Sequence, residues 1–265
     1  MATQPIPTLQ EKLNSGQTVR TLSIGPLANA NLVEIIALEG GTDGVWFDQE
    51  HAAISYADLA HLLRASRACA LDAWVRIAPT DYATAMRPFE LGASGLMAAQ
   101  VRDPAQARQI AQWTHYPPQG ERGLFAGNWE ARYGQVTPAE HTRGANRRVC
   151  TVIQIETEAA LQTVEAIAEL EGIDGLFVGT GDLACALGVA GEPLHPKCID
   201  ALRRVSCAAS AKNKFWGAQV RNAEHARQCR DLDCRLFSLT SDFLVVRRGL
   251  QAIFGEFETV LAATQ

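Results

Sequence analysis

Two carboxylates stand just past the ends of short apolar runs, at positions where they could share one site. Glu156 follows the β-branched run 149–155, and Asp182 follows the run 175–178 within the segment GTGDL. The residues between the two runs have helical apolar spacing, so the pattern predicts a strand, a helix and a second strand. Parallel strands joined by a right-handed crossover end on the same rim of a sheet, so we expect both carboxylates on that rim.

Two adjacent carboxylates repel each other unless a cation or a shared proton lies between them. Ligation by two carboxylates, with room left for waters and a substrate, suits Mg²⁺ or Mn²⁺. The spacing is equally compatible with a structural role, in which Glu156 caps the following helix and Asp182 caps a short turn.

A third carboxylate precedes a histidine in the segment FDQEH, at the end of the run 44–48. Asp48 lies three residues before His51. By accepting the ring N–H, Asp48 could orient His51 and raise its basicity, which prepares a general base. The alternative is a buried histidine that a local carboxylate satisfies.

Arg76 interrupts the apolar run 72–77. A cation in such a run needs a fixed anionic partner, which is either a structural carboxylate or the carboxylate of a substrate. In GTGDL, the glycines let backbone N–H groups approach a ligand closely, and a short helix beginning at Asp182 would favour an anion.

The chain around these residues alternates between strand-like runs and helical patterns. Strand-like runs occupy 21–25, 44–48, 72–77, 95–99, 149–155, 175–178, 215–220 and 235–239. Helical patterns follow them at 29–39, 55–69, 81–91, 103–113, 158–170, 196–211, 222–232 and 242–261. Eight pairs in about 250 residues predict an α/β fold, a (β/α)₈ TIM barrel formed as a single domain over 1–265. A doubly wound open sheet would leave the eighth pair unexplained.

Two segments depart from the alternation. The connection 114–148 reads as a structureless insertion, and an insertion of that length in a barrel usually carries function or contacts a partner. The last helix, 242–261, has a broader apolar face than packing on a barrel requires. We therefore expect it to pack against another subunit as well.

Composition narrows the partners and the compartment. A net charge of −5 gives no indication of a nucleic-acid or anionic-membrane partner, and no apolar run is long enough to span a membrane. The N-terminus lacks the features of a signal peptide, and the seven cysteines have no metal-site spacing. We expect a cytoplasmic protein with reduced thiols.

Taken together, five motifs resemble the HpcH/HpaI aldolases, the metal-dependent (class II) pyruvate aldolases of the phosphoenolpyruvate/pyruvate barrel superfamily. They are DxEH after the second run, VR in the third, YPPxGxRG at 116–123, QxE in the fifth run and DGxFxGxxDL at 174–183. Three stretches differ from the usual family sequence: GTGDL in place of GPADL, AAQV after the fourth run, and LFAGNWEARYG after Gly123.

The resemblance implies a role for each matching position. Glu156 and Asp182 would hold a divalent metal, Mg²⁺ or Mn²⁺ or Co²⁺, with no organic cofactor. Arg76 would bind the keto oxygen of pyruvate, and Gln154 would line the pocket. Backbone N–H groups near Gly181 and Asp182 would receive the pyruvate carboxylate. His51, oriented by Asp48, would act as acid and base through a water.

The implied reaction cleaves or forms 4-hydroxy-2-oxo acids, giving pyruvate and an aldehyde through a metal-stabilised enolate. The family commonly assembles as a homohexamer of swapped dimers that exchange the last helix. The four lysines, Lys12, Lys197, Lys212 and Lys214, end none of the predicted strands. An aldolase that lacks a Schiff-base lysine is left with the metal route.

Two other functions stay open. A 2-oxo diacid decarboxylase or a related lyase could use the same metal and pyruvate site, although a lyase acting on an acyl-CoA would need a basic groove that the sequence does not indicate. A barrel that binds a small keto acid without catalysis, or serves as an oligomeric scaffold, belongs to a different class.

Overall fold

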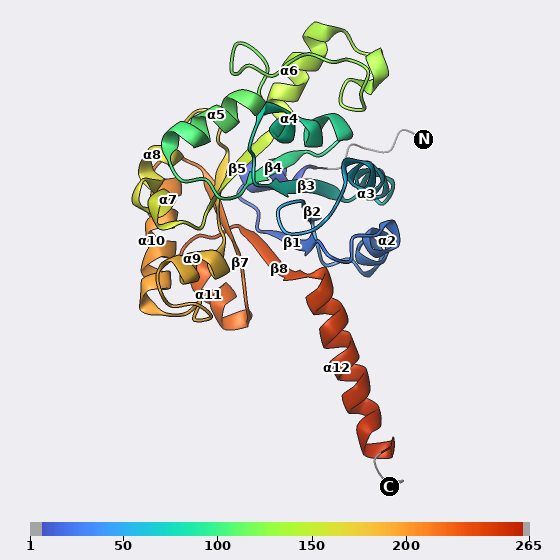
Figure 1. The fold of residues 1–265 in the computed structure, drawn as a ribbon, viewed down its shortest axis with the longest axis vertical. Helices are drawn as coiled ribbons and strands as arrows, with labels where there is room; N and C mark the ends of the chain where they lie inside the picture. The colour runs from blue at the N-terminus through green and yellow to red at the C-terminus, as the bar shows by residue number, and fades with distance from the viewer. Residues whose placement is uncertain (1–6, 262–265) are drawn as a thin grey trace.

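Eight parallel strands close into a barrel in which each strand pairs with its neighbours in chain order, and β8 returns to β1. This computed structural model describes residues 7–261, so residues 1–6 and 262–265 of the expected domain lie outside it. Helices surround the barrel (Figure 1). The predicted TIM barrel is confirmed.

The strands are β1 (Val19–Ile24), β2 (Gly44–Asp48), β3 (Asp72–Ile77), β4 (Gly95–Ala98), β5 (Cys150–Ile155), β6 (Gly175–Val178), β7 (Phe215–Gln219) and β8 (Leu236–Ser241). The helices are α1 (Leu9–Asn14), α2 (Ala30–Glu39), α3 (Tyr56–Ala68), α4 (Tyr82–Leu91), α5 (Pro104–Thr114), α6 (Pro138–Arg148), α7 (Glu158–Gln162), α8 (Val164–Ala168), α9 (Thr180–Ala186), α10 (Pro196–Ser210), α11 (Ala223–Asp231) and α12 (Asp242–Leu261).

The inward face of the barrel is apolar at one end and polar at the other. Trp46, Trp74 and Val152 belong to a buried cluster inside the barrel, which Leu9 and Leu13 of α1 close from below. Residues two positions apart along a strand point to the same face. Asp48, Arg76 and Gln154 each follow one of these apolar residues by two, so their side chains point into the carboxyl-terminal mouth.

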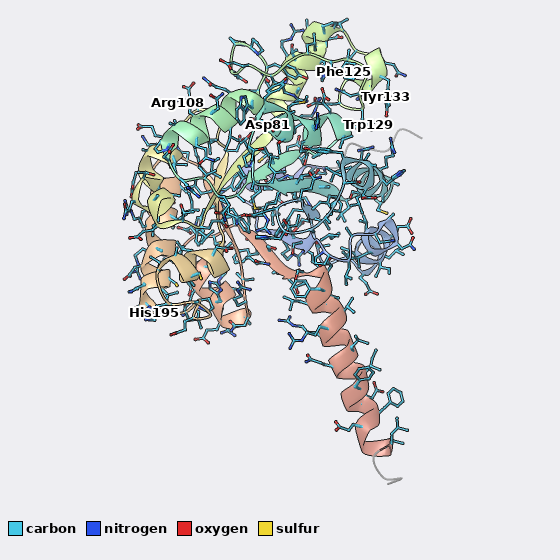
Figure 2. All side chains as sticks on the ribbon, viewed as in Figure 1. Asp81, Arg108, Phe125, Trp129, Tyr133 and His195 are labelled. Carbon is cyan, nitrogen blue, oxygen red and sulfur yellow. The ribbon has the colours of Figure 1, made fainter. Side chains whose placement is uncertain are left out.

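The connection between α5 and β5 is not structureless, and in this respect the sequence prediction was wrong. It contains a 3₁₀ turn at Arg132–Gly134 and the helix α6. Thr137 and Glu140 form a capping box, and Pro138 occupies the first turn, which together start α6. Phe125, Trp129 and Tyr133 project from the preceding segment and are exposed (Figure 2).

Two further differences concern helices. The segment predicted as one helix over 158–170 divides at Thr163 into α7 and α8. The short helix after β6, α9, begins at Thr180 instead of Asp182.

The last helix extends away from the barrel (Figure 1). Most of its large apolar side chains are exposed, and six of them recur at helical spacing along one side. They are Phe243, Val246, Leu250, Ile253, Phe254 and Phe257. Across residues 7–261, no helix combines the length and apolar character that crossing a bilayer requires.

Asp242 ties the end of β8 to the loop that follows β1. Its Oδ2 accepts hydrogen bonds from the backbone N–H groups of Gly25 and Leu27, each at 2.8 Å. Oδ1 accepts from the backbone N–H of Phe243, also at 2.8 Å. The buried carboxylate therefore holds the β1–β8 seam together at the mouth of the barrel.

Replacing Asp242 with alanine should lower the free energy of unfolding by about 3 kcal/mol, because buried N–H groups lose their acceptor. Urea denaturation monitored by circular dichroism measures this loss. Asp200→Ala is the matched control, since Asp200 is an exposed carboxylate on α10, and it should change stability by less than about 0.5 kcal/mol. Equal losses in the two variants would contradict the role of Asp242 at the seam.

Candidate active site

Asp48 and Arg76 form a buried, two-pronged ion pair across the β2–β3 ladder. The two residues are in register on adjacent strands. Arg76 Nε lies 3.0 Å from Asp48 Oδ1, and Arg76 Nη2 lies 2.6 Å from Asp48 Oδ2. The guanidinium carbon also lies 4.9 Å from the centre of the Trp46 ring. Arg76 thus has a structural carboxylate as its partner, and its Nη1 keeps no hydrogen bond to any residue in the described part of the chain.

The expected hydrogen bond from the His51 ring to Asp48 does not form, so that part of the prediction was wrong. Asp48 Oδ1 instead accepts the backbone N–H groups of Glu50 and His51, at 3.1 and 3.3 Å. Both Asp48 oxygens already accept hydrogen bonds from Arg76, whose guanidinium provides two donors in parallel. The single N–H of the His51 ring cannot match this pairing. His51 Nε2 lies 3.6 Å from Glu50 Oε2, and its side chain is 59% exposed.

Glu50 is a site residue that the sequence did not single out. Its side chain is buried, and Oε2 lies 3.4 Å from Arg76 Nε without an aligned hydrogen bond. Glu50 is the second acid of DQEH, but nothing in the sequence indicates that its carboxylate, and not that of Asp48, lies beside the His51 ring.

Glu156 is buried at the end of β5 and accepts three hydrogen bonds. Gln100 donates to Oε1 from its backbone N–H at 2.7 Å and from its side-chain amide at 3.1 Å. Gln154 donates from Nε2 to Oε2. Gln100 has φ +56°, a left-handed conformation that turns both of its donors toward Glu156. Thr157, not Glu156, caps α7, so the capping role that the sequence left open for Glu156 is wrong.

Asp182 and Gly181 lie in the first turn of α9, directly after β6. Gly179 is the N-cap of this helix and receives no side-chain capping bond. The Asp182 side chain is exposed and accepts no hydrogen bond within residues 7–261, so it caps nothing there. Its carboxylate is free to bind a ligand at the mouth.

The three acids lie close enough to affect one another. Burial raises the pKa of the Glu156 carboxyl above its usual value, and the negative charges of Glu50 and Asp182 raise it further. The amide donors of Gln100 and Gln154 act in the opposite direction but do not compensate. The mouth therefore holds more negative charge than Arg76, already paired with Asp48, can neutralise.

The donor set fits a hard divalent cation with few protein ligands. No three Asp, Glu, His or Cys side chains are clustered as a metal site in the described residues. Mg²⁺ commonly takes only one or two carboxylates and fills its other positions with water and substrate. The buried oxygens Glu50 Oε2 and Gln154 Oε1 lack hydrogen-bond donors, so they could accept from such waters.

None of the four lysines belongs to a barrel strand. Lys12 and Lys212 pair with Asp43 and Glu169, and Lys197 and Lys214 donate to backbone carbonyls.

Comparison with known proteins decides the family. Residues 20–247 match the HpcH/HpaI aldolase/citrate lyase family. The chain belongs to this family. It is similar to a pyruvate aldolase of Rhizobium etli, with 30% identity over 96% of this chain and 99% of that protein. It is also similar to a 4-hydroxy-2-oxovalerate aldolase of Rhodococcus jostii, with 36% identity over 78% of this chain and 80% of that protein.

A solved family structure has the same architecture. The HpcH/HpaI aldolase/citrate lyase family protein from Burkholderia cenocepacia superposes with a TM-score of 0.87 at 28% identity. The match covers 94% of this chain and 98% of that one.

A divalent cation should stabilise the protein through Glu156 and Asp182. At a concentration of 100 times its Kd, Mg²⁺ or Mn²⁺ should add about 2.7 kcal/mol to the free energy of unfolding. Glu156→Gln and Asp182→Asn should remove this gain, whereas Asp200→Asn should keep it. Thermal melts with and without a chelator measure the effect.

The increase in the free energy of unfolding that the cation gives should also depend on pH. Because the pKa of Glu156 is raised, a proton competes with the cation at a higher pH than at an ordinary glutamate. The stabilisation should be complete above that raised pKa and disappear as the pH falls through it. A gain that persists in both carboxylate variants would argue against this pair as the cation site.

Proposed function

We propose that this protein is a metal-dependent class II aldolase that cleaves or forms 4-hydroxy-2-oxo acids, with pyruvate and an aldehyde as the partners. The observation that carries the proposal is the group of Glu156, Asp182 and Glu50 at the carboxyl-terminal mouth of a TIM barrel, where Glu50 also lies beside Arg76. Catalytic residues of TIM-barrel enzymes gather at this end. Curated relatives named as aldolases support the same reaction class.

Glu156 and Asp182 would hold the cation, which when bound supplies Lewis-acid polarisation of the keto oxygen. Arg76 presents Nη1 to the same oxygen, because Asp48 and Trp46 fix the other side of its guanidinium. In cleavage, the electron pair of the breaking C–C bond moves toward that oxygen, where Arg76 stabilises the developing charge. A fixed donor of this kind typically contributes about 3 to 4 kcal/mol to the transition state.

His51 would move the proton. In cleavage it takes the proton of the aldol hydroxyl, directly or through one water, as the aldehyde carbonyl forms. Glu50, 3.6 Å from the ring, is placed to orient His51 in the role first assigned to Asp48. Gln154 would line the pyruvate pocket, and the backbone N–H groups of Gly181 and Asp182 would receive the pyruvate carboxylate, as the family implies.

Exchange of the pyruvate methyl protons for deuterium tests the proposal without any aldehyde. With Mg²⁺, Mn²⁺ or Co²⁺, the wild-type protein should exchange them, and Glu156→Gln and Asp182→Asn should abolish the exchange. Arg76→Lys should slow it by about 100-fold, since lysine cannot reproduce the two-pronged pair with Asp48. Nuclear magnetic resonance follows the reaction, and Asp200→Asn serves as the control. Unchanged exchange in both carboxylate variants would refute the site.

We also propose that the protein is a cytoplasmic homo-oligomer, a homohexamer built from dimers whose subunits exchange α12. The row of exposed apolar side chains from Phe243 to Phe257, here called the stripe of α12, is not covered by the barrel. An exposed apolar surface of this kind supports a second copy of the chain as its partner. The free state of all seven cysteines supports a reducing compartment.

Phe254→Asp should reduce the molar mass measured by light scattering, because it places a charge within this row of apolar side chains. Ala252→Asp adds the same charge on the opposite side of α12 and should leave the mass unchanged. Identical masses for wild type and Phe254→Asp would exclude the stripe as the contact surface.

A further inference from the structure

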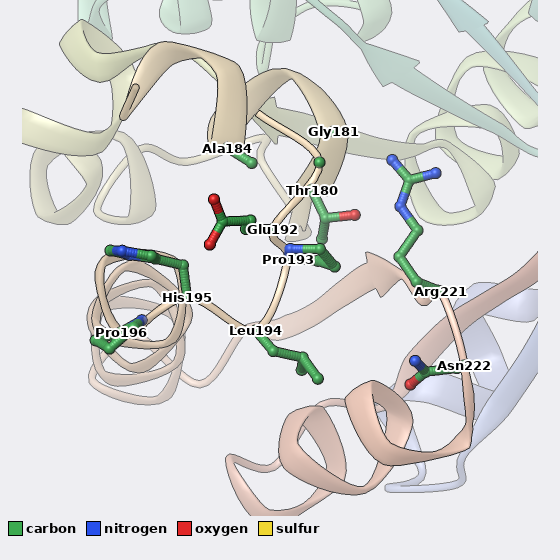
Figure 3. Close-up of a pocket in the computed structure, with 11 residues that line it drawn as sticks. Thr180, Gly181, Ala184, Glu192, Pro193, Leu194, His195, Pro196, Arg221 and Asn222 are labelled. Carbon is green, nitrogen blue, oxygen red and sulfur yellow. The ribbon is translucent and has the colours of Figure 1, made fainter. Parts of the chain in front are cut away.

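A pocket of about 830 Å³ opens beside the proposed pyruvate site. Its walls come from the start of α9, the loop that leads into α10, and the turn between β7 and α11 (Figure 3). Gly181, directly before Asp182, lies on its wall. Pyruvate has only three carbon atoms, so a pocket of this size leaves space for a second, longer molecule.

Arg221 supplies the positive charge of this pocket. It is the second residue after the end of β7, and its guanidinium points toward Gly181 (Figure 3). In the described part of the chain, no carboxylate lies within ion-pair distance of Arg221. The other arginine at the mouth, Arg76, is paired with Asp48 through Nε and Nη2. An unpaired guanidinium in a pocket is a ready partner for a carboxylate or phosphate group, which it binds through two parallel hydrogen bonds.

Gly181 makes room for this guanidinium. A Cβ at position 181 would lie 2.5 Å from Arg221 Nη2, closer than the two atoms can approach. Any side chain larger than glycine would therefore displace Arg221 from its present position. The identity of residue 181 and the position of the Arg221 charge are thus coupled.

The wall opposite Arg221 carries polar groups that can bind hydroxyl groups of a substrate. The Glu192 carboxylate and the His195 ring lie across the pocket from Arg221 (Figure 3). His195 Nδ1 accepts the backbone N–H of Lys197 at 3.2 Å, which leaves Nε2 as the protonated nitrogen of the neutral ring. The two groups can hydrogen-bond hydroxyls between the reacting end of a substrate and its charged end.

We infer that Arg221 determines acceptor specificity, by binding an anionic group at the far end of the aldehyde. This inference rests on the proposed aldolase function. The anionic group is a carboxylate or a phosphate, which a guanidinium recognises in the same way. The preferred acceptor is thus an aldehyde whose charged end reaches past Gly181 into the pocket.

The test compares anionic and neutral acceptors in the presence of pyruvate and Mg²⁺. Succinic semialdehyde is paired with 4-hydroxybutanal, and glyceraldehyde 3-phosphate with glyceraldehyde, so the two pairs separate carboxylate from phosphate. Wild type should prefer the anionic member of at least one pair. Arg221→Ala should reduce that ratio of kcat/KM by about 10- to 100-fold, and Arg221→Lys should restore part of it. Arg227→Ala, an exposed arginine on α11, should leave the ratio at the wild-type value.

A double-mutant cycle tests the coupling to residue 181. Gly181→Ala should lower the anionic preference of the wild type but should cause no further loss of preference in Arg221→Ala. An equal effect of Gly181→Ala in both backgrounds would refute the coupling. If Arg221→Ala instead raises the KM of pyruvate equally with charged and neutral acceptors, Arg221 binds the pyruvate carboxylate and the inference is wrong.

Deuterium exchange into pyruvate separates the two possible failures. Exchange by wild type needs no acceptor, so its absence would refute the aldolase proposal itself. Exchange together with an acceptor preference that Arg221→Ala does not alter would refute only the assignment of Arg221.

Discussion

The organisation of this protein depends on an imbalance of charge at one end of the barrel. Glu156, Glu50 and Asp182 bring three carboxyl groups together, and the cation within their reach, Arg76, is already bound by Asp48. Burial removes the water that would screen the repulsion at Glu156. The amides of Gln100 and Gln154 relieve it only in part. A fold that retains such a cluster is more stable with a positive ligand than without one.

The apolar half of the barrel fixes the positions of Asp48 and Arg76 at the mouth. Trp46 and Trp74 fill the interior below the mouth and are almost completely buried. Asp48 and Arg76 stand one inward position above them on neighbouring strands, so the ion pair rests on a rigid floor. Because Trp46 also contacts the guanidinium, Arg76 has little freedom to turn toward another acid. Packing thus determines which face of the arginine is left for a substrate.

The sequence predicted the barrel because eight strand–helix pairs allow few other topologies. It also predicted which strand ends carry the polar groups. It failed where the outcome depends on competition between contacts. Asp48 had two possible partners, and Arg76 offers it better geometry than His51 does. The left-handed turn at Gln100 has no signature in its residue type. The helix α6 could have been found, since TPAE at 137–140 is a capping box next to a favourable proline.

Asp242 has a consequence that reaches beyond its local hydrogen bonds. It is the first residue of α12 and also the acceptor that anchors the chain after β1. The protruding helix is therefore attached to the barrel at the seam between β1 and β8. Gly25, one of the two residues that Asp242 anchors, lies beside Asp48: a Cβ added at Gly25 would lie 3.6 Å from the Asp48 Cβ. The residue that starts α12 and the ion pair that positions Arg76 are thus separated by a single loop at the mouth of the barrel.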